Sequence, residues 1–154
     1  MYLHKEDREL FKDMIRYVSE KANIREDIIE KDYYVTLLLL ELSQIEYPVV
    51  FKGGTSLSKA YRVIDRFSED IDITFTEHLG EARRKKLKYK VMRPISEKLG
   101  LTIVNWEHIE SDKDLNRYVF SYESVVDDAD DKIPSVVIIE TSLMSYSFPT
   151  NMCE

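Results

Sequence analysis

The first third of the chain carries apolar residues at helical spacing. From about Lys5 to Glu20 they recur every three or four positions and predict a helix: Leu10, Phe11, Met14, Ile15 and Val18. Asn23 followed by Glu26 resembles a capping box, which predicts a second helix running to about Leu42. The second half of that helix is apolar nearly all round, so we expect it to be buried.

The period then changes. Residues 48–51 form a short apolar run that ends at Lys52-Gly53-Gly54, which predicts a strand followed by a tight turn. After the glycines, one face of a third helix is predicted by Leu57, Ala60, Tyr61 and Ile64. Residues 70–75 alternate strictly between polar and apolar, the pattern of a half-buried strand.

The remaining half predicts one helix and three strands. Residues 81–99 form a basic helix with apolar positions four apart, which Pro94 should kink or restart. The ranges 101–106, 118–122 and 136–140 are predicted as strands. This order of elements favours an α+β fold with a mixed β-sheet packed with helices. We expect one domain over residues 1–154, with N-terminal helices in 1–46 and a core of about 47–145.

Composition limits the classes of protein that fit. The chain has 154 residues, of which 44% are hydrophobic and 33% charged, as expected for a globular domain with a core. Its net charge of −7 gives no long-range attraction to nucleic acid. A single cysteine excludes a disulfide-stapled domain, and no apolar stretch approaches the roughly 20 residues of a membrane helix. No signal peptide is visible, so we expect a cytoplasmic protein without membrane contact.

Gly53-Gly54-Thr55 lies between a predicted strand and a predicted helix. Glycines let the backbone approach a ligand closely, and the amides that open a helix favour phosphate. A Gly-Gly turn that only joins two elements is the alternative. Lys52 and Lys59 flank this turn, where each could neutralise triphosphate charge or stay an ordinary exposed lysine.

Asp70 and Asp72 project from the same face of the following strand, with Cα atoms about 6.5–7 Å apart. Two carboxylates so placed repel unless a cation lies between them, and Mg²⁺ prefers such oxygens together with substrate phosphates. The alternative is that both merely solvate an edge strand. Glu140, which closes an apolar strand, is either the point where that strand meets water or a third carboxylate. Three acids could hold two metal ions for phosphoryl chemistry.

Two segments carry a family resemblance. Residues 51–61, Phe-Lys-Gly-Gly-Thr-Ser-Leu-Ser-Lys-Ala-Tyr, followed by Arg-Phe-Ser-Glu-Asp-Ile-Asp at 66–72, look like the AbiEii/AbiGii toxin family. That family belongs to the DNA-polymerase-β-like nucleotidyltransferase superfamily. Residues 29–36, Ile-Glu-Lys-Asp-Tyr-Tyr-Val-Thr, resemble its upstream helix. The resemblance covers about 24–72 well and 136–152 more loosely.

The resemblance implies a toxin of a type IV toxin–antitoxin or abortive-infection system. Such an enzyme transfers a nucleoside monophosphate from an NTP, with Mg²⁺ or Mn²⁺, to an acceptor such as tRNA, and has a cognate antitoxin. By position, Asp70, Asp72 and Glu140 would be the metal ligands. Gly53, Gly54 and Thr55 would form the phosphate cradle, with Ser68 as a hydroxyl lining the site.

Other functions remain open from the residues alone. A catalytically inactive module of the same fold could bind nucleotide or RNA, and a phosphotransferase would act on the γ-phosphate instead. The family continues into a helical C-terminal region that we expect to be missing here, which puts activity of these 154 residues in doubt. The seven cations between Arg83 and Arg93 are either a solvated helix face or a track for tRNA.

Overall fold

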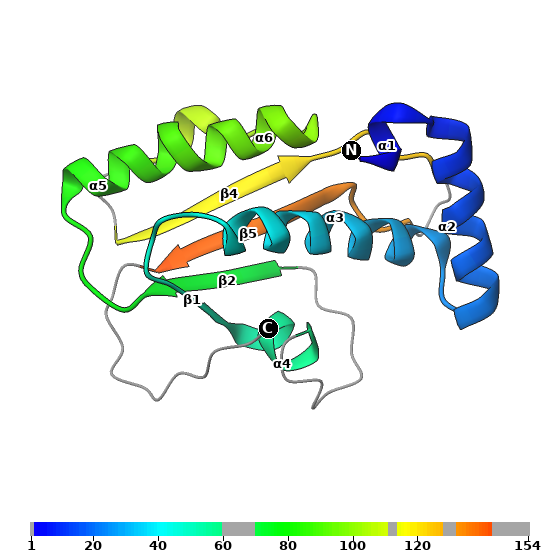
Figure 1. Ribbon diagram of the computed structural model, residues 1–154, viewed down its shortest axis with the longest axis horizontal. Helices are drawn as coiled ribbons and strands as arrows, with labels where there is room; N and C mark the ends of the chain where they lie inside the picture. Colours follow the sequence, from blue (N-terminus) through cyan, green and yellow to red (C-terminus); the bar gives the residue numbers. More distant parts are fainter. Residues whose placement is uncertain (1, 60–69, 111–113, 128–131, 143–154) are drawn as a thin grey trace.

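The centre of the molecule is a five-stranded mixed sheet (Figure 1). The computed structural model describes residues 2–59, 70–110, 114–127 and 132–142. The strands lie in the order β1-β2-β5-β4-β3, and β2 runs parallel to β5 while the other neighbours are antiparallel. Their bounds are β1 Val49–Lys52, β2 Asp70–Phe75, β3 Thr102–Ile103, β4 Leu115–Ser121 and β5 Val136–Ser142.

Helices precede the sheet and alternate with its first strands. Their bounds are α1 Leu3–Glu6, α2 Arg8–Ala22, α3 Glu26–Ser43, α4 Gly53–Lys59, α5 Glu81–Lys86 and α6 Arg93–Leu99. A π-helical segment, η1 Leu87–Met92, joins α5 to α6, and a 3₁₀ turn, η2 Trp106–His108, follows β3. This arrangement confirms the α+β fold with a mixed sheet. No helix in the part of the chain that the structure describes is long and apolar enough to cross a membrane.

The core lies between one face of the sheet and the helices α3, η1 and α6. Alternate residues of β2 and β5 are fully buried there, namely Ile71, Ile73, Val137 and Ile139. The buried residues of α3 pack on both strands (Figure 1). Burial of its apolar second half is only partly as predicted, because Leu40 is 49% exposed. Helix α6 packs on β3. We call this the covered face of the sheet. The opposite face, which carries the intervening residues of each strand, is the open face.

The capping box predicted at Asn23 is wrong. Asn23 instead ends α2, in the left-handed conformation (φ 53°, ψ 44°), and its N–H bonds to the carbonyl of Ser19. Asparagine tolerates this conformation at a helix end nearly as well as glycine does. The residue before α3 is Arg25, which makes no side-chain cap and pairs with Asp27 at 2.6 Å.

Pro94 does not break the basic helix but sits in the first turn of α6. A proline ring inside an α-helix clashes with the carbonyl four residues earlier. Here the preceding turn is π-helical, and the N–H of Arg93 bonds to the carbonyl of Lys88, five residues back. The wider turn accommodates the proline without a separate helix start.

The predicted strands differ from the observed ones at their ends. β3 is only two residues long, because the chain turns at residues 104–105 and then enters the 3₁₀ turn. There the Lys88 ammonium lies over the Trp106 ring, 4.7 Å from its centroid. β5 continues past Glu140 to Ser142, so Glu140 lies inside a strand and not at its end. The predicted helix after the glycines begins at Gly53, and its positions beyond Lys59 lie outside the described residues.

Candidate active site

The glycine turn is pressed against the acidic strand. Gly53 has φ +75°, a conformation that side chains rarely adopt, and a Cβ built on it would lie 2.0 Å from Oδ2 of Asp72. Glycine is therefore required here by both backbone geometry and the neighbouring carboxylate. The buried Thr55 hydroxyl donates to the carbonyl of Asp70, and the Ser56 hydroxyl donates to the carbonyl of Gly53 at 2.8 Å. The first bond fastens the start of α4 to β2, and the second lies within the first turn of α4.

Four charged residues form one row across the open face. In the sheet register Lys52 of β1 pairs with Asp72 of β2, Asp72 with Glu140 of β5, and Glu140 with Arg117 of β4. Partners in register share a face, so all four side chains leave the sheet on the same side. Asp70 lies on this face too, two residues before Asp72. The row thus sets two acids between two cations, with a third acid beside them.

The carboxylates repel one another in part. Burial raises the pKa of the Asp72 carboxyl above its usual value, and the charge of Asp70 raises it further, while Lys52 opposes both. All three acids are half-buried, which weakens solvent screening without removing it. A carboxyl whose pKa is raised by burial, with a second carboxylate beside it, is a candidate for cation binding or chemistry.

The Glu140 carboxylate is engaged by Arg117. Arg117 Nε is 3.7 Å from Oε1 of Glu140, and the two side chains are 57% and 39% exposed. Among the described residues, no three histidine, cysteine or acidic side chains converge closely enough to hold one metal ion. The donor chemistry of Asp70, Asp72 and Glu140 suits Mg²⁺ or Mn²⁺. A three-ligand site would require Glu140 to leave Arg117.

Lys59 lies at the other end of α4 and contacts α3. Its ammonium is 2.5 Å from each carboxylate oxygen of Asp32 and 3.4 Å from the Thr36 hydroxyl. The segment that resembles the family's upstream helix therefore ties the helix after the glycine turn to the body of the protein. Spacing along the chain carried no sign of this contact, since Asp32 and Lys59 are 27 residues apart.

The basic helix does not adjoin the acids. It packs on the covered face, and four of its seven cations have partners: Arg83 with Glu77, Arg84 with Asp114, Arg93 with Glu97, and Lys88 with the Ile109 carbonyl. Lys88 is buried and the Arg84 side chain is only 11% exposed, so a solvated face describes only part of this set, and none of these contacts leads to the acids. Ser68, predicted as a hydroxyl lining the site, lies outside the described residues.

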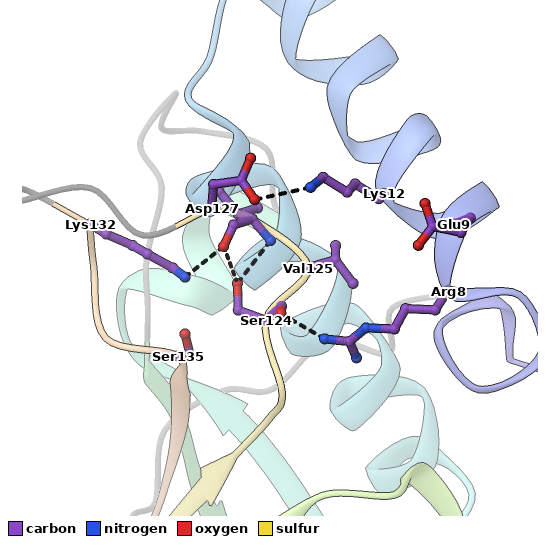
Figure 2. Close-up of a pocket in the computed structure, with 9 residues that line it drawn as sticks. Arg8, Glu9, Lys12, Ser124, Val125, Asp127, Lys132 and Ser135 are labelled. Atoms are coloured by element: carbon purple, nitrogen blue, oxygen red, sulfur yellow. Dashed lines mark hydrogen bonds and ion pairs between the residues drawn. The ribbon is translucent and has the colours of Figure 1, made fainter.

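A polar cavity of about 550 Å³ lies elsewhere, between α2 and the loop after β4. Figure 2 shows its basic side chains already engaged: Lys12 with Asp127, Arg8 with the Ser124 carbonyl and Lys132 with the Val126 carbonyl. None of the predicted site residues lines this cavity. The open face therefore remains the candidate site.

Comparison with known families agrees with this geometry. Residues 37–153 match the family described as nucleotidyl transferase AbiEii toxin, type IV toxin–antitoxin system. The chain belongs to this family of nucleotidyltransferases. The match includes the glycine turn, β2 and β5, and it begins within α3, after Asp32. No curated protein and no solved structure matches the chain.

Proposed function

We propose that this toxin-family member transfers a nucleoside monophosphate from an NTP to a hydroxyl of an RNA acceptor such as tRNA, or of a protein. The observation that carries the proposal is the parallel pairing of Asp72 with Glu140, next to a glycine turn that faces Asp72. A phosphate-binding turn and three carboxylates on adjacent strands are what a triphosphate and its metal ions require.

Asp70, Asp72 and Glu140 would hold Mg²⁺ or Mn²⁺. When bound, the metal neutralises phosphate charge and activates the attacking hydroxyl. The backbone of Gly53, Gly54 and Thr55 would receive the triphosphate, because the absence of a side chain at Gly53 lets this turn lie directly against Asp72, which would hold the metal ion. Lys52, next in the row, would add positive charge on this flank. Ser68 would line the site, and Lys59 would add positive charge at the triphosphate if it leaves Asp32.

The reaction is an in-line substitution at the α-phosphorus. The acceptor hydroxyl oxygen forms the new P–O bond, the bond from the α-phosphorus to the bridging oxygen breaks, and pyrophosphate leaves. The hydroxyl proton passes to a carboxylate of the row. The residues of the site hold both reactants in line, and such positioning provides much of the rate enhancement in phosphoryl transfer.

The test is substitution of the paired aspartates in the full-length protein. Asp70→Asn and Asp72→Asn should each lower transfer of α-labelled NTP to total tRNA by at least about 10³-fold, because each removes a charge that binds the metal. Asp13→Asn, an exposed aspartate on α2, is the matched control and should keep full activity. If both site variants transfer as well as the wild type, the mechanism is wrong. Release of nucleoside diphosphate in place of pyrophosphate would indicate a phosphotransferase.

One observation favours a second function, a binding module without catalysis. Glu140 lies beside Arg117, and no three-ligand metal group forms among the described side chains. A pure binder should hold nucleotide or RNA equally well with and without EDTA, whereas the proposed enzyme should lose NTP affinity. A cytoplasmic location and a cognate antitoxin complete the proposal, and co-expression of that antitoxin should suppress toxicity.

A further inference from the structure

Arg117 lies on the flank of the acids that faces away from the glycine turn. Resting on the function proposed above, we propose that Arg117 binds a phosphate of the RNA acceptor next to the attacking hydroxyl. The row Lys52–Asp72–Glu140–Arg117 places one cation on each side of the acids. Neighbouring strands are about 4.8 Å apart, so the backbones of Lys52 and Arg117 lie roughly 14 Å apart across the sheet. The two cations therefore flank the acids from opposite sides.

The glycine turn decides which reactant lies on which flank. Gly53 follows Lys52 directly and approaches Asp72 so closely that a single added carbon would collide with the carboxylate. If this turn is the phosphate cradle, as proposed above, the triphosphate occupies the β1 flank. In-line transfer requires the attacking group to approach from the side opposite the leaving pyrophosphate. That side is the β5–β4 flank, where Glu140 and Arg117 lie.

The Arg117 side chain is available, while its backbone is held in place. Its carbonyl accepts from the Asn105 side chain at 2.6 Å, and its strand pairs with β5 along its full length. The guanidinium is 57% exposed and 3.7 Å from Glu140, a surface ion pair of little strength. When Glu140 turns to a metal ion, Arg117 loses this partner. A planar guanidinium then fits a phosphate through two parallel hydrogen bonds.

The surface around Arg117 suits a nucleotide better than a protein side chain. On the same face of β4, Leu115 is 63% exposed and Val119 is partly exposed, with Ile138 beside Val119 on β5. An apolar surface next to a phosphate-binding arginine can cover a base while the backbone is held. An acceptor serine or tyrosine carries no phosphate for Arg117 to bind, so an RNA acceptor is favoured.

The experiment separates the two substrates kinetically. In the full-length protein, Arg117→Ala should raise KM for total tRNA roughly tenfold, the effect of one charge-assisted contact, and leave KM for NTP unchanged. Arg117→Lys should recover part of the loss. The log–log salt dependence of tRNA binding should become shallower by about 1. Arg93→Ala is the matched control: Arg93 is 58% exposed and ion-paired but lies on the basic helix.

Each other outcome overturns the assignment. No change in KM for tRNA, an equal rise in KM for NTP, or wild-type transfer to a protein acceptor and not to RNA would show that Arg117 does not bind acceptor phosphate. If the wild type and Arg93→Ala both lack transfer to any acceptor, the proposed function itself fails. If Arg117→Ala unfolds, as thermal melting would show, the KM ratio of Arg117→Lys decides by the same criteria.

Discussion

The two faces of the sheet carry opposite kinds of side chain from the same strands: one face is apolar and buried, and the other is acidic and half-buried. On the covered face, β2 and β5 present Ile71, Ile73, Val137 and Ile139, all fully buried. On the open face the residues between them include Asp70, Asp72 and Glu140, all half-buried. Because side chains alternate along a strand, the apolar set fixes the orientation of the acidic set. Packing of the apolar residues into the core therefore directs the three carboxylates to the open face.

The two faces also differ in the direction in which the pKa of a carboxyl group is shifted. On the covered side, Glu41 of α3 is buried, but Lys98 and the Tyr2 hydroxyl donate to it at 2.6 and 2.5 Å. Burial alone would raise the pKa of Glu41, yet these two bonds outweigh it and lower the pKa. On the open face the pKa of Asp72 is raised. The Glu41 carboxylate is stabilised by its two donors, whereas the pKa of Asp72 is raised mainly by burial that its neighbours do not offset, as in a candidate cation site.

Ile71→Ala should produce the largest loss of stability. Ile71 is fully buried beside Ile139, so truncation removes apolar contacts and leaves a cavity, at a cost of about 2–5 kcal/mol. Ile138→Ala, one strand away on the open face, should cost less than about 1.5 kcal/mol because its surroundings are partly solvated. Urea denaturation measures both. Equal losses would mean that the open face is packed as a second core.

Gly53→Ala comes next. The substitution places a Cβ against the Asp72 carboxylate in a left-handed conformation, and we expect a loss of about 1–3 kcal/mol together with a fall in NTP affinity. Gly80→Ala is the matched control, since it has φ −63° and no atom within 4 Å of an added Cβ. Denaturation and nucleotide titration report the two effects. An unperturbed Gly53→Ala variant would remove the glycine turn from the proposed site.

Asp72→Asn should change the stability of the fold least, and should raise it where the other two substitutions lower it. Because the folded pKa of Asp72 is raised, ionisation of this carboxyl disfavours folding at neutral pH. The variant should be more stable by roughly a few tenths of a kcal/mol without metal, since solvent screens a half-exposed group. The gain should shrink as the pH falls through the raised pKa towards the ordinary value. A variant less stable than wild type at pH 7 would show that the attraction of Lys52 outweighs the burial of the Asp72 carboxyl.

Short-range pattern accounted for much of the fold. Strict alternation predicted β2 with its bounds, and the apolar second half of α3 predicted most of its burial, Leu40 being exposed. Predictions at element ends were weaker. Asparagine is common both at the end of a helix and at the start of one, so the sequence could not decide whether Asn23 ends α2 or begins α3. The left-handed backbone at Asn23 shows that it ends α2. Pro94 was accommodated by a π-helical turn whose hydrogen bonds have no sequence signature.

The candidate site divides in the same way. Asp70 and Asp72 share a face because they are two residues apart in one strand, so the sequence by itself determined that pair, and likewise the turn at Gly53-Gly54. Tertiary structure alone decided that Glu140 lies beside Asp72, that Arg117 follows in the same row, and that Lys59 reaches Asp32. The reason is physical: spacing along a strand is set by covalent geometry, whereas strand order and register arise from packing between segments far apart in the chain.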